Sequence, residues 1–207
     1  MDEPPRNPFS TRFTRPGALP FYFREGDDAA RLLARLRRHN WFGQIVGPHG
    51  SGKSTLLAVL RPALADAGRD VTLVELRKNE GGLRHVWRKL FGEQDTAAGQ
   101  RLSANTQVII DGYEQLGWWA RCLVVRGCRR RGCGLLVTAH DDSGLPTLYT
   151  TRPRLGLALA LVRRLAPLAD VIGEPDVEAA WHANRGDMRE TLFSLYDLFE
   201  RRRPAGD

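Results

Sequence analysis

The chain has 207 residues, of which 42% are apolar and 27% charged, and its formal net charge at pH 7 is +7. This composition is typical of a folded protein, and the length suffices for one α/β domain with a small appended unit. No run of 18 or more apolar residues occurs, so we expect no membrane-spanning helix.

Two further features of the sequence concern location and partners. The chain begins Met-Asp-Glu-Pro-Pro, without the basic start and apolar stretch of a secretory signal, which favours a cytoplasmic location. The spacing of Cys122, Cys128 and Cys133 does not match a zinc knuckle, so we expect reduced thiols, with Cys122 in a helix core. The arginine excess is compatible with nucleic-acid binding but does not require it.

The first third of the chain predicts an arm, a helix, a strand and a second helix. Residues 1–20 are rich in proline and lack a periodic pattern, and their aromatic residues favour an arm that packs onto the domain. Asp27 and Asp28 can cap a helix whose apolar residues recur at helical spacing from Ala29 to Leu36. A short strand is expected over residues 41–46 and a helix over 52–67.

The remaining elements continue the alternation of strands and helices. Strands are expected over residues 71–76, 107–111, 135–138 and 145–150, helices over 83–91 and 113–130, a loop over 92–104, and helices from residue 155 onward. This order predicts a three-layer α/β/α fold with a mostly parallel sheet of about five strands. We expect a nucleotide-binding core with its arm over residues 1–152, and a small C-terminal helical lid over 153–207.

A phosphate-binding loop is the most specific pattern in the sequence. Residues 47–54, Gly-Pro-His-Gly-Ser-Gly-Lys-Ser, fit G-x-x-x-x-G-K-[ST] in full and stand between an expected strand and an expected helix. Its glycines let successive backbone N–H groups point at phosphate oxygens, and the helix adds its positive end. The candidate nucleotide-binding residues are Gly47, Pro48, His49, Gly50, Ser51, Gly52, Lys53, Ser54 and Thr55.

The same loop and the third strand supply candidates for catalysis and metal binding. Lys53 can bridge the β and γ phosphates of ATP, and the Ser54 hydroxyl can ligate Mg²⁺. Asp111 ends an apolar strand, where a carboxylate can hold the same Mg²⁺ through water. Many P-loop ATPases carry a water-activating Glu directly after that Asp, but here the position is Gly112. Glu114 either replaces that Glu or is a simple acid at a helix N-terminus.

Three more polar residues are weaker candidates. Thr138 or His140, at the tip of the fourth strand, can orient the attacking water or touch the γ-phosphate, or can merely cap the strand end. Glu75 on the second strand is a further carboxylate, for which a structural role at the strand edge is favoured.

This ordered set of motifs resembles the AAA+/STAND class of P-loop ATPases, and within it the bacterial ExeA-like and TniB-like ATPases. The stretch that carries the second resemblance is Asn7-Pro8-Phe9, then Phe21-Tyr22-Phe23, a helix and the phosphate loop. The resemblance implies that Pro8, Phe9 and the segment around residues 21–23 flank adenine.

The C-terminal tail provides a further resemblance to the AAA+ class. Gly186-Asp187-Met188-Arg189 is similar to the G-D-x-R pattern of the AAA+ lid, in which the arginine reaches the γ-phosphate and couples nucleotide state to lid position. The resemblance assigns that role to Arg189, although Arg189 is also one more arginine on an arginine-rich helix. Residues 129–131, 152 and 154 are all arginines, and the sequence does not rank them as arginine fingers.

These observations lead to one expected function and two alternatives. The expected function is an ATP-binding, Mg²⁺-dependent ATPase that acts as a nucleotide-driven switch or motor, through a protein partner or self-assembly. The first alternative is a small-molecule or nucleotide kinase, and the second is an ATP-gated binding module with little hydrolysis, which the missing acid at position 112 favours. Trp118 and Trp119 are adjacent on an expected helix and point about 100° apart, so an interface role is open.

Overall fold

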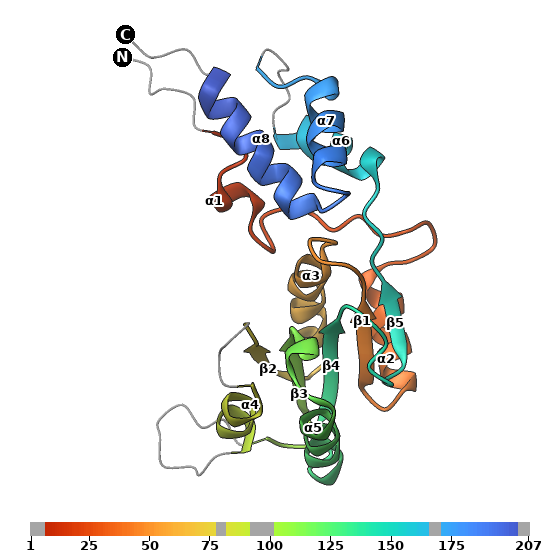
Figure 1. Cartoon of the computed structure of the whole chain (residues 1–207). Coiled ribbons are helices and arrows are strands. Elements are labelled where there is room, and N and C mark those ends of the chain that lie inside the picture. Colours follow the sequence, from red (N-terminus) through yellow and green to blue (C-terminus); the bar gives the residue numbers. More distant parts are fainter. Residues whose placement is uncertain (1–6, 78–81, 92–101, 166–170, 203–207) are drawn as a thin grey trace, which may run out of the picture. The chain divides into compact units, whose positions relative to one another are not determined.

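A computed structural model describes residues 7–77, 82–91, 102–165 and 171–202. The described residues form two compact units, which we treat separately (Figure 1). The α/β unit comprises residues 23–47 and 57–150, and the helical unit comprises the described parts of 1–22, 48–56 and 151–207. The division expected at residues 152 and 153 stays a prediction. In the described part of the chain, no helix is both long enough and apolar enough to cross a bilayer.

A five-stranded sheet forms the middle layer of the α/β unit. Its order is β2-β3-β4-β1-β5, and all four pairings are parallel. Because every strand runs the same way, the carboxyl ends meet at one edge, where Val46 pairs with Ala139 and Glu75 with Asp111. The strands are β1 (Phe42–Val46), β2 (Asp70–Glu75), β3 (Thr106–Asp111), β4 (Gly134–Ala139) and β5 (Thr147–Thr150).

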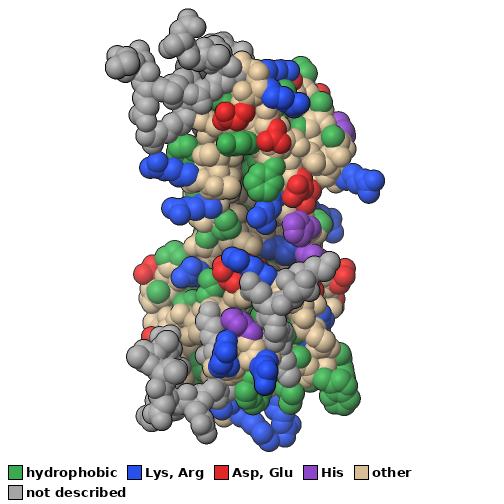
Figure 2. Space-filling model, turned by 60° about the vertical axis from the view of Figure 1, so that its left-hand side comes forward, with side chains coloured by type: hydrophobic (Ala, Val, Ile, Leu, Met, Phe, Trp, Pro, Cys, Tyr) green, Lys and Arg blue, Asp and Glu red, His purple; other side chains and the backbone are tan. Residues whose placement is uncertain are grey.

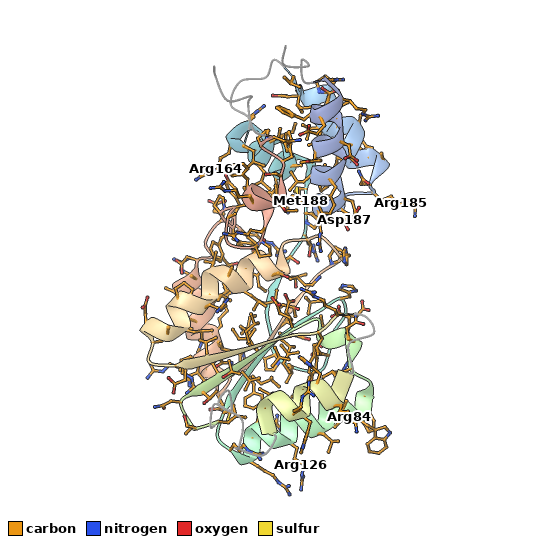
Figure 3. The ribbon with its side chains drawn as sticks, turned by 90° about the vertical axis from the view of Figure 1, so that its left-hand side faces the viewer. Arg84, Arg126, Arg164, Arg185, Asp187 and Met188 are labelled. Carbon is orange, nitrogen blue, oxygen red and sulfur yellow. The ribbon has the colours of Figure 1, made fainter. Side chains whose placement is uncertain are left out.

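Helices cover both faces of the sheet, which confirms the three-layer fold expected from the sequence. On one face lie α2 (Ala29–Arg38) and the part of α3 (Lys53–Asp66) from residue 57 onward (Figure 3). On the other lie α4 (Gly82–Phe91) and α5 (Trp118–Arg130), which share one apolar core with the sheet. The cap of α2 is also as expected, since the Asp28 carboxylate accepts the N–H of Arg31 at 2.7 Å.

The single helix expected over residues 113–130 is wrong. Residues 113–115 form a short 3-10 turn, η1 (Tyr113–Gln115), and α5 begins only at Trp118. The backbone at Leu116 is extended, with ψ of 131°. Gly117, which then caps α5, is also extended, and glycine loses more entropy in a helix than other residues do. The turn therefore separates Glu114 from the helix whose first turn it was expected to occupy.

The helical unit is built from α1 (Thr11–Thr14), α6 (Leu155–Leu165), α7 (Glu174–Ala183), α8 (Met188–Arg202) and the N-terminal arm. Phe9 of the arm is 1% exposed and packs edge to face against Phe199, with ring centroids 6.2 Å apart. The Asn7 amide donates to the Tyr196 carbonyl at 3.0 Å and to the Glu200 carboxylate at 2.8 Å. Asn7 and Phe9 of the expected arm thus pack against the C-terminal helices, whereas Phe13 is exposed and residues 1–6 lie outside the described residues.

The three cysteines differ in burial, and one expectation about them is wrong. Cys122 is exposed rather than inside a helix core, because the buried positions of α5 nearest to it are Ala120 and Val124. Two residues of helix turn the chain by about 200°, so position 122 faces away from the sheet. Cys128 and Cys133 are buried, and burial raises the pKa of the Cys128 thiol to about 12.

Thiol labelling tests this arrangement. With an excess of a chromogenic disulfide reagent at pH 8, we expect one thiol to react quickly in the native protein and three to react in denaturant. Cys122→Ser removes the fast phase, because the other two thiols are buried and stay protonated. Fast reaction of two or three thiols in the native protein would contradict the burial of Cys128 and Cys133.

Candidate nucleotide-binding site

The phosphate-binding loop runs directly from β1 into α3. Gly50 and Gly52 have φ of 64° and 89°, a left-handed conformation that favours glycine. α3 begins at Lys53, whose ammonium donates to the Pro48 carbonyl at 2.7 Å. The loop therefore has the backbone curl that its glycines predict, and its lysine lies folded across it.

Two contacts from outside the loop hold it within the helical unit. The Ser51 hydroxyl lies 2.6 Å from the hydroxyl of Thr151, the residue that follows β5. Phe21 of the arm lies so close to Gly52 that a β-carbon there would be 3.7 Å from its ring. Of the aromatic residues that the resemblance places near adenine, Phe21 therefore lies beside the loop, whereas Phe9 is buried against Phe199.

The Asp187 carboxylate also touches the loop. Its Oδ2 lies 3.1 Å from Nδ1 of His49, and a β-carbon on Gly50 would fall 1.8 Å from its Oδ1. The same Oδ1 accepts the backbone N–H groups of Arg189 at 2.9 Å and Glu190 at 3.1 Å, which caps α8 (Figure 3). A carboxylate at the start of α8 thus contacts the loop whose motif predicts phosphate binding.

The strand acid Asp111 is held by Thr138 at the carboxyl edge of the sheet. The Thr138 hydroxyl donates to Asp111 Oδ1 at 2.5 Å and accepts the N–H of Gly112 at 2.9 Å. Thr138 is fully buried on β4, next to β3. Of the roles considered for it, the structure shows the holding of a neighbouring strand end. At the same edge, Glu75 is exposed and pairs in register with Asp111.

Glu114 and His140 lie together near this edge. His140 Nε2 is 3.5 Å from Glu114 Oε1, and the buried Glu114 Oε2 has no hydrogen-bond partner among the described residues. A buried carboxylate oxygen without a donor is costly, so the site has an open acceptor position that a water molecule would satisfy. The 3-10 turn is what places Glu114 there.

Gly112 explains why no acid directly follows Asp111. Its φ is 85°, and a β-carbon at this position would lie 2.6 Å from the Leu76 carbonyl oxygen. Any side chain at position 112 would therefore strain the backbone and collide with the Leu76 carbonyl, which directly follows β2. The glutamate that many P-loop ATPases carry at this position does not fit here.

The remaining candidate, Arg189, has an exposed side chain whose guanidinium lies 5.6 Å from the centre of the Phe193 ring, one turn further along α8. Sequence reasoning selected the arginine of G-D-x-R and passed over the aspartate. Asp187 is part of that motif, but its contact with His49 joins residues 138 positions apart, and no local sequence pattern predicts such a contact.

Comparisons with known proteins agree with the fold. No protein-family model matches the chain, and no curated protein is detectably similar in sequence. NtrX from Brucella abortus in complex with ATP is 13% identical over 89% of this chain and 51% of its own, with a TM-score of 0.59. NtrX with ADP is 12% identical over 95% and 55%, with a TM-score of 0.60.

RuvB from Thermotoga maritima is 17% identical over 80% of this chain and 57% of its own, with a TM-score of 0.50. This chain has the P-loop NTPase fold. It spans about half the length of these structures, and at such low identity the similarity concerns the fold alone. The narrower likeness to ExeA-like or TniB-like ATPases stays a prediction.

Replacing Gly112 tests the strained turn after Asp111. Gly112→Ala should lower the free energy of unfolding by about 2 kcal/mol or more, because it adds a left-handed alanine and a collision with a carbonyl. The matched control is Gly156→Ala in α6, where a β-carbon meets nothing within 4 Å, and which should be neutral or stabilising by up to about 1 kcal/mol. Equal urea midpoints for Gly112→Ala and the wild type would contradict the assigned backbone.

Proposed function

We propose that the chain binds ATP together with Mg²⁺ and hydrolyses it as an AAA+-type ATPase. The observation that carries the proposal is the complete phosphate-loop sequence at residues 47–54, between β1 and α3, with Gly50 and Gly52 in the left-handed conformation. The shared fold with NtrX, solved with ATP and with ADP, supports the nucleotide.

In this proposal the loop binds the triphosphate, and Ser54 and Asp111 bind its metal ion. Backbone N–H groups of the loop and the Lys53 ammonium neutralise phosphate charge. Ser54 and Asp111 supply hydroxyl and carboxylate oxygens, the ligand type that Mg²⁺ prefers. Thr138 suits this role of Asp111, because its hydroxyl donates to Oδ1 and holds the carboxylate at the carboxyl edge of the sheet. Bound Mg²⁺ would supply charge neutralisation at the β and γ phosphates.

Glu114 is the proposed water-orienting residue. Its buried Oε2 has no hydrogen-bond partner among the described residues and can accept a hydrogen bond from the attacking water, while His140 lies 3.5 Å from Oε1. The reaction then proceeds by attack of that water on the γ-phosphorus and departure of ADP. Glu114 thereby takes the place of the acid that position 112 cannot carry.

The lid segment is the proposed output of the nucleotide. Asp187 caps α8 and also touches His49 and Gly50 of the loop, so phosphates that bind the loop must displace its carboxylate. Displacement of the carboxylate moves the start of α8, and a partner protein or a second copy of the chain can bind one position of α8 more tightly than the other. We propose that Arg189, two residues further on, then turns toward the γ-phosphate.

Hydrolysis by the purified protein tests the proposal. We expect release of free phosphate from MgATP, and a loss of at least about a hundredfold in turnover for Lys53→Ala and for Asp111→Asn, since each removes charge stabilisation of the transition state. The control is Arg61→Ala, which removes an exposed cation further along α3 and should leave turnover unchanged.

Product and binding measurements separate the alternatives. Equal turnover in the wild type and Lys53→Ala would overturn the proposal, and a phosphorylated acceptor in place of free phosphate would identify a kinase. Tight binding of a fluorescent ATP analogue without turnover would favour the binding module, for which Gly112 in place of an acid is the motivating observation.

A pair of Asp187 variants tests the lid contact. Asp187→Asn keeps a good helix cap but removes the negative charge beside the loop, so ATP should bind about fivefold more tightly, as about 1 kcal/mol of repulsion is relieved. Asp187→Ala should show the same gain and also lose about 1 kcal/mol of stability with the cap. Fluorescent-nucleotide titration and urea unfolding measure the two effects, and unchanged or weaker ATP binding by Asp187→Asn would show that this carboxylate does not oppose phosphate.

A further inference from the structure

Two helices on one face of the sheet carry several basic residues and no acidic ones. Between them, α4 and α5 contain seven of the 31 lysines and arginines and none of the 24 aspartates and glutamates. All other residues of the chain therefore balance, with 24 of each sign, and the net +7 equals the charge of these two helices. They lie on the same face of the sheet, where Arg84 of α4 and Arg126 of α5 are exposed (Figure 3).

The same two helices expose most of the large apolar side chains that the described residues leave in solvent. Trp87 is 41% exposed, Trp118 65% and Trp119 75%. The rings of Trp118 and Trp119 meet edge to face, with centroids 4.5 Å apart and planes at 72°, so they present two differently oriented ring faces. Basic and hydrophobic side chains stand side by side over this part of the α/β unit in Figure 2.

We call this surface the α4–α5 face and define it by its exposed tryptophans and arginines: Trp87, Trp118, Trp119, Arg84, Arg88 and Arg126. It is a rigid platform, because Val86 and Leu90 of α4 and Val124 of α5 are buried in the core beneath it. A ligand therefore meets two helix backbones that are already ordered, and only the exposed side chains lose rotamer freedom on binding.

The chemistry of this face selects its ligand. Guanidinium groups bind phosphates, and exposed indole rings stack on flat aromatic partners. A purely apolar partner would leave the arginines desolvated and unpaired. Duplex DNA offers phosphates but hides the faces of its bases inside the stack, whereas a single strand offers both. We propose that the α4–α5 face binds single-stranded nucleic acid, with bases stacked on Trp118 and Trp119 and phosphates paired with arginines of both helices.

Binding of a fluorescein-labelled oligo(dT) of about 20 nucleotides, followed by anisotropy in the absence of ATP, tests the proposal. We expect binding at low salt that weakens linearly in log–log salt plots, and quenching of tryptophan fluorescence. The double variant Trp118→Ala/Trp119→Ala should bind at least about tenfold more weakly, and Arg84→Ala/Arg126→Ala should also lower the salt slope by roughly 1.4. All four positions are exposed, so these variants should keep the wild-type melting temperature.

The control is Arg37→Ala/Arg38→Ala, which removes two exposed arginines from α2 on the opposite face of the sheet and should leave affinity within about twofold. An equal loss in this control, or no loss in the tryptophan variant, would overturn the proposal in favour of non-specific attraction. Tryptophan-dependent binding to poly-glutamate or to duplex DNA as tight as to oligo(dT) would overturn it in favour of an acidic protein or a duplex. Lys53→Ala should bind oligo(dT) normally, so failure here is distinguishable from failure of the ATPase proposal.

Discussion

One hydroxyl group ties together the strand ends that the proposed chemistry needs. Thr138 donates to the Asp111 carboxylate and accepts the N–H of Gly112, and so joins the tip of β4 to the exit of β3. Because the strands are parallel, this junction forms at the edge where β1 also ends and the phosphate-binding loop begins. The Gly47 N–H still pairs with the Ala139 carbonyl at 3.2 Å, so the sheet register continues up to the loop. A one-residue slip of β4 would remove Thr138 from Asp111 and turn its side chain to the other face of the sheet.

The turn after Asp111 depends on the same junction. The Gly112 N–H is fixed by Thr138, and a β-carbon on Gly112 would lie 2.6 Å from the Leu76 carbonyl oxygen. Gly112 therefore adopts a left-handed conformation that costs glycine little and other residues more. The chain then forms a tight 3-10 turn in place of an α-helix, and Glu114 comes to lie beside His140. The backbone conformation that excludes an acidic residue at position 112 thus also places the Glu114 carboxylate beside His140.

The sequence predicted what local pattern and chain order determine. The loop at residues 47–54 carries its chemistry in eight consecutive residues, and strand-helix alternation implies the three layers. The features that the sequence did not predict depend on contacts between distant residues, or on glycines that interrupt a pattern otherwise typical of a helix. The break at Leu116 follows from backbone preferences at Gly112 and Gly117 that outweigh an apolar period compatible with a helix. The approach of Asp187 to His49 joins the start of α8 to the loop across 138 positions of the chain, and no sequence period encodes it.

The two proposed sites share a short and well-braced stretch of chain. Glu114 lies in η1 and Trp118 opens α5 four residues later, and Arg121 links them by donating to the carbonyls of Glu114 at 3.2 Å and Leu116 at 2.8 Å. Tyr113 anchors the same turn, since it is buried and its hydroxyl donates to the Arg121 carbonyl at 3.2 Å. A strand stacked on Trp118 would therefore contact the same braced stretch of chain that carries Glu114.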